Sequence, residues 1–233
     1  MAFDAICLRA TLAELRPALT GAKIDKIQQP SSDTLYISLR TVQGNRKLLV
    51  NTGAHAPRIQ FTTATRENPA QPPMFCMLLR KHLQGARVAE VTQPGGDRVA
   101  RFELLCTDEL GDAAHRSLIV ELMGRYANVI LTDAEGIILD CLRRVDAEMS
   151  PVRQLLPGLL YRAPALLDKR TLEASGDAEI EAVLRNEETV TDKTLLAHFA
   201  WLSPLTARET LARAGGSRLL LGREIGALRD DIL

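Results

Sequence analysis

Two groups of short, alternating segments, each preceded by one helical segment, place the strongest constraint on the fold of this chain. The first group occupies residues 22–63 and the second occupies residues 86–145. Apolar and polar residues partly alternate with the period of half-buried β-strands, and turn residues separate the segments. Apolar residues at helical spacing precede the groups in residues 3–19 and 72–85. We therefore expect an α+β fold in which a two-layer β-sandwich is flanked by helices.

The character of the chain changes after residue 145. A connector with two prolines, "SPVRQLLPGLLY", follows the last expected strand, and helical spacing begins at about residue 166. We predict two domains, residues 1–165 and residues 166–233, and we expect the second to be a small all-helical domain. Its last helix reaches the end of the sequence without a capping residue, which indicates a chain cut from something longer.

Two of the expected C-terminal helices resemble a helix-hairpin-helix unit. They occupy residues 192–200 and 205–215, and the short stretch "WLSP" links them. Such units often grip a phosphate backbone through main-chain amides. The glycine pair usual in that hairpin is absent and the segment is net acidic, so packing is the favoured role for these helices.

The charge balance argues against a protein that coats DNA indiscriminately. The 29 basic and 29 acidic residues cancel. Residues 1–170 hold 22 Lys or Arg against 18 Asp or Glu, and the remaining residues hold 7 against 11. Arginine outnumbers lysine 23 to 6, which is compatible with contacts to phosphates and bases. A GC-rich genome would produce the same bias.

The sequence predicts a reduced, cytoplasmic protein. No apolar run approaches the roughly 20 residues that a membrane helix needs. The first fifteen residues carry an acid at position four and have helical spacing, unlike a signal peptide. The cysteines have apolar neighbours and form no CxxC pair, so we expect neither disulfides nor zinc. They are Cys7, Cys76, Cys106 and Cys141.

No motif in the sequence indicates catalysis. The four histidines are far apart, and no Walker loop, no GxSxG and no GxGxxG after a strand is present. We therefore expect a binding module, not an enzyme, with no catalytic residues, no metal and no cofactor.

Polar residues interrupt the expected strands at two places. Asp97 and Arg98 follow a Pro-Gly-Gly turn, and as neighbours at the mouth of a strand they are expected to point to opposite faces. In residues 121–131 a period of two would place Glu121, Met123 and Arg125 on one side of a strand, and the glycine at 124 indicates a bulge or close approach. A structural role is the alternative at both places.

A third polar stretch ends the helix expected at residues 72–85. Arg80, Lys81 and His82 follow an apolar run there, where cations also suit the helix dipole. Residue chemistry alone favours a structural role for them.

Four long segments resemble signatures of the NFACT family, which comprises bacterial RqcH and eukaryotic NEMF and was long catalogued in bacteria as fibronectin-binding proteins. The resemblance is collinear along the whole chain and covers the NFACT-N domain and the helix-hairpin-helix region. The coiled coil and the NFACT-R domain of longer members are not in this sequence. The segments are "NPAQPPMFCMLLRKHLQG", "GGDRVARFE", "IVELMGRYANVILTD" and "RQLLPGLLY".

The resemblance implies a role at the ribosome. Family members bind a large ribosomal subunit obstructed by peptidyl-tRNA and recruit charged tRNA, alanyl-tRNA in bacteria. They support C-terminal alanine tailing of the stalled chain without mRNA, and the ribosome makes the bond. The implied partners are thus tRNA and the obstructed large subunit, without DNA or membrane.

The family fold is similar to the N-terminal domain of formamidopyrimidine-type DNA glycosylases. Those enzymes attack with an exposed N-terminal proline and carry zinc-binding cysteines. Here Ala2 and Phe3 follow the initiator methionine and no such cysteines are present, so the resemblance does not carry the glycosylase chemistry over.

The resemblance places the functional Asp-Arg pair of the family at Asp97 and Arg98. Arg98 is suited to a phosphate or a base edge, and Asp97 to base amino groups, ribose hydroxyls or orientation of the arginine. Arg125 is implied as a second tRNA contact. Further candidate nucleic-acid contacts are Glu121, Met123, Arg80 and Lys81.

Two other functions remain open from the sequence. One is a surface adhesin that binds fibronectin, against which the absent signal peptide and the reduced cysteines count. The other is a DNA repair enzyme, against which the missing glycosylase nucleophile counts.

Overall fold

The computed structural model describes residues 3–108, 110–164, 175–200 and 202–215. The chain divides into two compact units, one spanning Cys7–Pro164 and the other combining Ala2–Ile6 with Ala165–Leu233. The domain boundary that the sequence predicts at residue 165 lies outside the described residues, as does the last predicted helix.

Helix α1 (Ala5–Leu19) supplies the first element of the first unit from Cys7 onward. Four leucines at helical spacing are completely or almost completely buried on one face of α1, as the sequence predicts. The helix is also tied to the sheet by polar contacts, because Arg16 Nε donates to the Val91 carbonyl at 2.8 Å. Gly21, with φ of 80°, then turns the chain into the first strand. The four leucines are Leu8, Leu12, Leu15 and Leu19.

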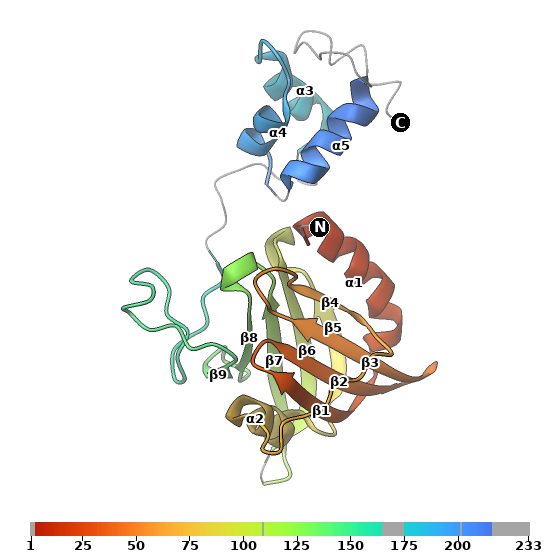
Figure 1. Cartoon of the computed structure of the whole chain (residues 1–233), viewed down its shortest axis with the longest axis vertical. Helices are drawn as coiled ribbons and strands as arrows, with labels where there is room; N and C mark the ends of the chain where they lie inside the picture. Colours follow the sequence, from red (N-terminus) through yellow and green to blue (C-terminus); the bar gives the residue numbers. More distant parts are fainter. Residues whose placement is uncertain (1–2, 109, 165–174, 201, 216–233) are drawn as a thin grey trace. The chain divides into compact units, whose positions relative to one another are not determined.

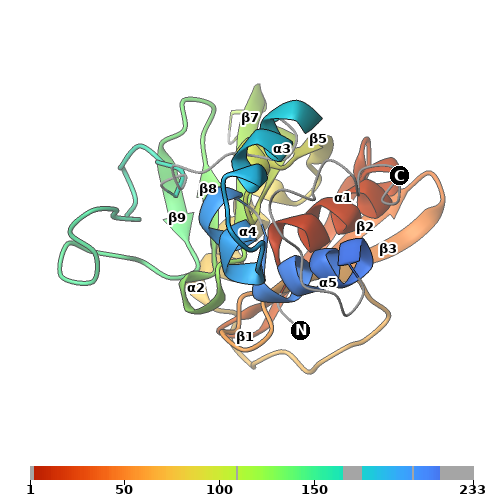
Figure 2. The ribbon, with the colours of Figure 1, turned by 90° about the horizontal axis from the view of Figure 1, so that it is seen from above.

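Within the described residues, nine antiparallel strands form one sheet, in the order β4-β3-β2-β1-β5-β6-β7-β8-β9 (Figure 1). Figures 1 and 2 both place β3 and β9 on opposite sides of the unit, as this order requires. The strands are β1 (Lys23–Ser31), β2 (Thr34–Thr41), β3 (Gly44–Asn51), β4 (Arg58–Phe61), β5 (Arg87–Thr92), β6 (Val99–Thr107), β7 (Ala113–Glu121), β8 (Asn128–Thr132) and β9 (Ile138–Cys141).

The two predicted strand groups are present, but they are joined in one sheet. The connection is the pairing of β1 with β5, in which Lys23 lies opposite Arg87. The groups also meet away from this edge, because Arg143 Nη1 donates to the carbonyl of Thr52 at 3.1 Å. The expected α+β class is therefore correct, whereas the expected pair of separate sheets is replaced by a continuous one. Alternation within a strand indicates its faces but not which edges pair.

Helix α2 (Met74–Leu83) connects the two strand groups. Prolines precede it, as expected for a helix start. Its apolar face, which includes Phe75, Cys76 and Leu79, is buried. Arg80 contributes to the same packing, since its Nε donates to the Ile27 carbonyl at 2.8 Å.

The segment after β9 folds back onto the end of the sheet. Isolated bridges pair Ile137 with Leu160 and Val145 with Leu155. These contacts enclose an apolar cluster that stabilises the β6–β9 half of the sheet. The buried members are Val99, Ile119, Ile130, Ile138, Cys141 and Leu155.

Three helices form the described part of the second unit: α3 (Asp177–Arg185), α4 (Asp192–His198) and α5 (Pro204–Gly215). Thr191 caps α4, accepting a hydrogen bond from the N–H of Thr194 at 3.2 Å. A short linker joins α4 to α5, as predicted from the sequence. The buried core of this unit comprises Leu184, Val190, Leu195, Phe199 and Ala207.

Candidate nucleic-acid interface

A braced glycine turn presents Asp97 and Arg98 at the start of β6. The turn, η1 (Pro94–Gly96), contains Gly95 and Gly96 with φ of 59° and 66°, a region that side chains disfavour. Gln93 Nε2 donates to the carbonyls of Gly96 and Asp97 at 3.2 and 2.8 Å. These bonds fix the backbone from which the Asp-Arg pair projects.

The side chains of Asp97 and Arg98 contact each other. Asp97 Oδ1 accepts from the backbone N–H of Arg98 at 2.7 Å and lies 3.7 Å from Arg98 Nε. The expectation that the two side chains point to opposite faces is wrong, because β6 begins only at Val99 and its alternation does not extend to this pair. The side chains are 24% and 42% exposed, respectively, so Arg98 remains accessible to a ligand while Asp97 helps to orient it.

A second turn lies at the same end of the sheet. The Arg98 carbonyl accepts from the N–H of Leu122 at 2.8 Å, and Val99 pairs with Glu121, which in turn pairs with Asn128. Between β7 and β8 the chain forms the short helical turn η2 (Gly124–Tyr126). The turn η2 therefore begins shortly after Leu122, the residue whose N–H is bound by the Arg98 carbonyl.

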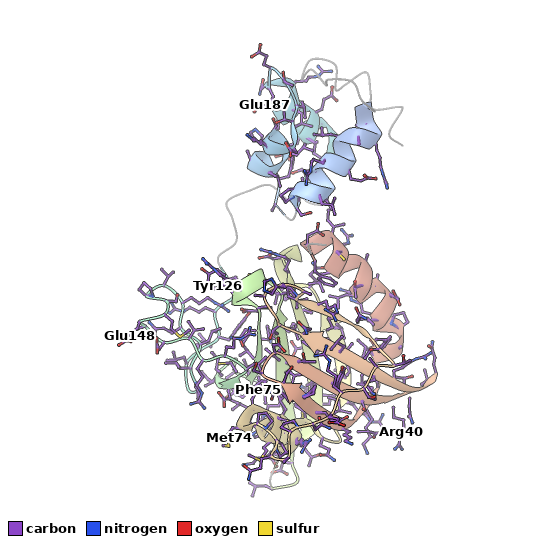
Figure 3. All side chains as sticks on the ribbon, viewed as in Figure 1. Arg40, Met74, Phe75, Tyr126, Glu148 and Glu187 are labelled. Atoms are coloured by element: carbon purple, nitrogen blue, oxygen red, sulfur yellow. The ribbon has the colours of Figure 1, made fainter. Side chains whose placement is uncertain are left out.

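Arg125 and Tyr126 form an exposed pair on η2. The Arg125 guanidinium lies 4.8 Å from the centre of the Tyr126 ring, and its Nη2 donates to the Tyr126 hydroxyl at 2.7 Å. Tyr126 is 67% exposed, and Figure 3 shows it at the surface of the unit. The sequence interpretation missed the role of Tyr126 in orienting Arg125, although the sequence places this aromatic residue directly after the arginine.

The expectation that Glu121, Met123 and Arg125 lie on one side of a strand is wrong. Gly124 has φ of 57° and belongs to a turn, so the alternation ends at Glu121 and resumes at Asn128. Glu121 and Met123 consequently do not share an exposed face with Arg125. Met123 is half-buried and packs against the apolar cluster of β6–β9.

Glu121 is a buried structural residue. Its side chain is 1% exposed and forms a close ion pair with Arg153, whose Nη1 lies 3.1 Å from Oε2. The Tyr161 hydroxyl donates to Glu121 Oε1 at 2.8 Å. Burial, and then the adjacent Glu121 carboxylate, raise the pKa of the Tyr161 phenol. The geometry therefore removes Glu121 from the candidate ligand contacts and makes it an anchor for the segment after β9.

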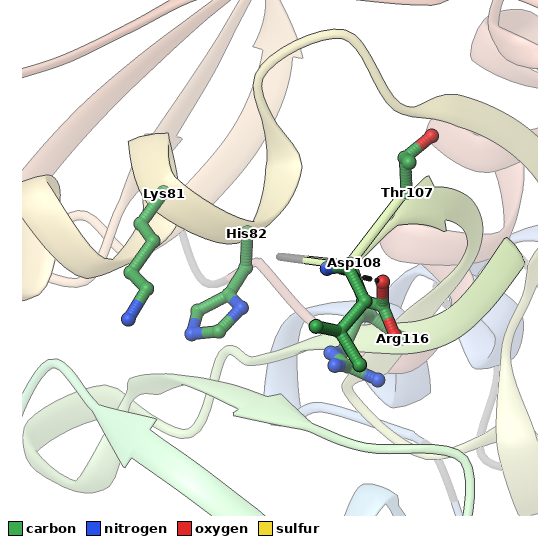
Figure 4. Close-up of a pocket in the computed structure, with 6 residues that line it drawn as sticks. Lys81, His82, Thr107, Asp108 and Arg116 are labelled. Atoms are coloured by element: carbon green, nitrogen blue, oxygen red, sulfur yellow. Dashed lines mark hydrogen bonds between the residues drawn. The ribbon is translucent and has the colours of Figure 1, made fainter. Parts of the chain in front are cut away.

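The cations of α2 lie at a different place from the Asp-Arg pair. Lys81 and His82 line a cavity of about 280 Å³ beside Thr107, where β6 ends (Figure 4). The nine residues of β6 separate this end from Arg98 by roughly 30 Å. Arg80 is engaged with the Ile27 carbonyl and is not at the strand mouth. The other lining residues are Asp108, Leu110 and Arg116.

The cysteines are thiols in low-polarity surroundings. Cys76, Cys106 and Cys141 are buried, and burial raises the pKa of all three. For Cys141 the pKa rises to about 12, since the neighbouring Asp140 carboxylate adds to the effect of burial. In the described ranges no three His, Cys, Asp or Glu side chains are grouped to hold a metal ion. None of the helices found there is long and apolar enough to cross a membrane.

The fold and the geometry of the Asp97-Arg98 pair at the start of β6 agree with the class of protein that sequence comparison indicates. A profile for the NFACT N-terminal and middle domains matches residues 4–227. The chain therefore belongs to the NFACT family.

Relatives of this chain are ribosome quality control proteins. It is 40% identical over 235 residues to the Rqc2 homolog RqcH of Bacillus subtilis, covering all of this chain and 41% of the relative. It is 35% identical over 141 residues to the ribosome quality control complex subunit NEMF of Homo sapiens, covering 60% of this chain and 12% of NEMF. The chain thus spans about two fifths of RqcH and a smaller part of NEMF.

Two solved structures are similar over most of the chain. The N-terminal domain of fibronectin-binding protein PavA from Streptococcus pneumoniae has a TM-score of 0.82 and 35% identity, covering 89% of this chain and 81% of that one. The N-terminal part of the fibronectin/fibrinogen-binding protein from Streptococcus suis has a TM-score of 0.86 and 32% identity, covering 98% and 84%.

Proposed function

We propose that this chain is the tRNA- and large-subunit-binding module of a ribosome-associated quality control factor. The observation that carries the proposal is the accessible Asp97-Arg98 pair on a braced turn, in a chain whose relatives are ribosome quality control proteins. In this role the protein recruits charged tRNA, alanyl-tRNA in bacteria, to a large subunit obstructed by peptidyl-tRNA. The tRNA then supports mRNA-independent tailing of the stalled chain.

The geometry of the pair supports recognition of a nucleotide. The partly exposed Arg98 guanidinium offers two parallel N–H donors, which suit a phosphate or the edge of a base. Asp97 Oδ1 accepts from the Arg98 N–H, which leaves Oδ2 for a base amino group or a ribose hydroxyl. A carboxylate opposes phosphate binding, so its presence favours reading of a base or ribose over a contact by charge alone.

Arg125 supplies a second contact in this proposal. Its guanidinium is held over the ring of Tyr126, which restricts its conformations before a ligand arrives. A side chain that is already ordered loses less entropy on binding. Arg98 and Arg125 together would engage neighbouring parts of one tRNA.

The protein contributes binding and orientation, and the peptide bond is formed by the ribosome. We propose no catalytic residue and no cofactor for this chain. The likeness to the N-terminal domain of formamidopyrimidine-type glycosylases concerns the fold. The hairpin formed by α4 and α5 is the part we assign as helix-hairpin-helix.

An adhesin is the competing function, because both similar solved structures carry fibronectin-binding names. Protease treatment of intact cells separates the two proposals. A quality control factor stays protected until the cells are lysed, whereas release from intact cells would support the adhesin.

Sequencing the RNA that co-purifies with the protein tests the proposal. We expect tRNA to be enriched with the wild-type chain and depleted with the Asp97→Ala, Arg98→Ala double variant. Arg66→Ala is the matched control, because Arg66 is an exposed arginine of the same unit in the loop after β4. Equal tRNA recovery from all three proteins would refute the assignment.

A further inference from the structure

Five cationic side chains share one face of the sheet, at β1, β2, β3 and β5. Two lie on β1, and three of the six lysines of the chain belong to this set. Lys26, Arg40 and Arg87 are exposed, and the other two are half-buried. We call this set the cationic face; it comprises Lys23, Lys26, Arg40, Lys47 and Arg87.

Strand register brings these residues into rows. Lys23 of β1 lies directly opposite Arg87 of β5 on one side and Arg40 of β2 on the other. In the next row Lys26 and Lys47 flank Ser38. Directly opposite residues have Cβ atoms about 4.5–5.5 Å apart, so each row gathers its charges closely.

The buried residues of β1 and β2 fix the face to which the cations of both rows point. Ile24 pairs with Leu39 and Ile27 pairs with Ile37, and all four are buried. Because neighbouring residues of a strand point to opposite faces, the cations are directed away from this core. A shift of register that hid the charges would expose the apolar pairs.

Such a row of like charges costs stability. Asp25 offsets one charge, because its Oδ2 lies 3.3 Å from Arg40 Nη2. Lys47 Nζ donates to the Ala64 carbonyl and Arg87 Nη1 donates to the Gly21 carbonyl, and these neutral acceptors leave the charges uncompensated. Glu90 lies on the same face as Arg87, because the two residues pair with Glu103 and Leu105 of β6, so the five cations with Asp25 and Glu90 carry a net charge of +3.

We propose that the cationic face binds the phosphate backbone of a structured RNA, as a contact separate from the Asp97-Arg98 pair. Figure 3 shows Arg40 on the side of the unit away from Tyr126 and the η2 turn. Tyr36, two residues from Ser38 on β2, is buried with its ring centre 5.6 Å from Lys47 Nζ and offers no surface for a base. The face therefore contacts phosphates without reading sequence.

The choice of RNA as the polyanion rests on the proposed function, whereas the charge arrangement does not. A bound polyphosphate releases counterions in proportion to the phosphates it neutralises, so the contact has a measurable salt dependence. An acidic protein is the other class of partner, and the experiment below distinguishes the two.

The test uses the full chain with the Lys23→Gln, Lys26→Gln double variant and a blunt 20-base-pair RNA duplex as the probe. We expect affinity at low salt to fall about tenfold, and the slope of log affinity against log salt to decrease by roughly 1–2. The Arg208→Gln, Lys193→Gln variant removes the same charge from exposed positions of the second unit and is expected to match the wild type. The melting temperature of the Lys23→Gln, Lys26→Gln variant should be unchanged or higher, because repulsion is relieved.

The Asp25→Asn variant should change duplex affinity in the opposite direction, and it completes the test. Removing the carboxylate that pairs with Arg40 should tighten duplex binding several-fold. The proposal would be overturned if the Lys23→Gln, Lys26→Gln variant and the Asp25→Asn variant both had the duplex affinity and salt slope of the control. If the Lys23→Gln, Lys26→Gln variant lost binding to poly-glutamate but kept its affinity for the duplex, the proposal would also be overturned, in favour of an acidic protein as the partner.

The outcome is separable from that of the proposed function. Asp97→Ala, Arg98→Ala should lose tRNA and retain the duplex. If that variant kept its tRNA affinity, the proposed function would fail while the result for the cationic face still stood.

Discussion

The backbone carbonyl of Arg98 accepts a hydrogen bond from the N–H of Leu122 at 2.8 Å, and this contact joins the two signature turns of the chain. Leu122 lies between Glu121, which is anchored in the interior, and the η2 turn, which carries Arg125. The positions of the exposed arginines therefore depend on buried groups behind them.

Loss of the buried ion pair should destabilise the first unit. Arg153→Ala leaves the Glu121 carboxylate buried and without its cation, which costs about 3–5 kcal/mol. Urea unfolding measures the loss. Arg213→Ala is the control, because Arg213 and Glu209 form an exposed pair at 2.8 Å whose removal should change the free energy of unfolding by about 0.5 kcal/mol or less. Equal effects of the two substitutions would contradict the role of Glu121 as an anchor.

The glycine turn should matter for binding as well as for stability. Gly96→Ala places a Cβ on a residue with φ of 66°, at a cost of about 1–2 kcal/mol, and the turn can relieve this strain by shifting Asp97 and Arg98. We expect several-fold weaker tRNA binding, measured by fluorescence anisotropy. Gly158→Ala carries a similar strain, with φ of 85°, away from the turn. If it weakened tRNA binding equally, position 96 would have no special role.

Alkaline pH should reduce stability through Cys141. Its thiol has a pKa of about 12 in the folded protein against 9.0 for an ordinary thiol, so above pH 9 the unfolded state releases a proton that the folded state keeps. Stability therefore falls as pH rises from 9 to 12. Cys141→Ser, which keeps a hydroxyl donor for the Arg143 and Leu155 carbonyls, should make the fall shallower by up to about 1.4 kcal/mol per pH unit. Parallel pH profiles of unfolding would contradict this account.

The strands and helices could be predicted because their patterns are local. Alternation identified the segments of β1 to β9, and apolar spacing identified α1 and α2. The same alternation failed at Gly124, because a turn of three residues leaves the polar and apolar order of its flanks unchanged. The sequence therefore placed Glu121 beside Arg125, although the structure buries one and exposes the other.

Contacts between distant residues could not be predicted from local patterns. Glu121 and Arg153 are 32 residues apart, and nothing in either segment marks the other as its partner. The rows of the cationic face depend on strand register, which alternation within one strand does not specify. Asp97 and Arg98 were singled out because an acid and a base followed a glycine turn, but their tRNA role came from the family resemblance.

The tRNA affinity of Asp97→Asn and Arg98→Ala tests the central claim most directly. Loss of the charge-assisted contact of Arg98 is worth about 1.5–3 kcal/mol, so Arg98→Ala should weaken binding roughly ten- to a hundredfold. Asp97→Asn removes a carboxylate that repels phosphate, yet we expect weaker binding, because Asp97 orients Arg98 and accepts from a base or ribose. The melting temperature serves as the folding control, with Arg66→Ala for an exposed arginine elsewhere. Tighter binding by Asp97→Asn would reduce the pair to a simple electrostatic contact, and unchanged binding by both variants would contradict a tRNA site at this strand mouth.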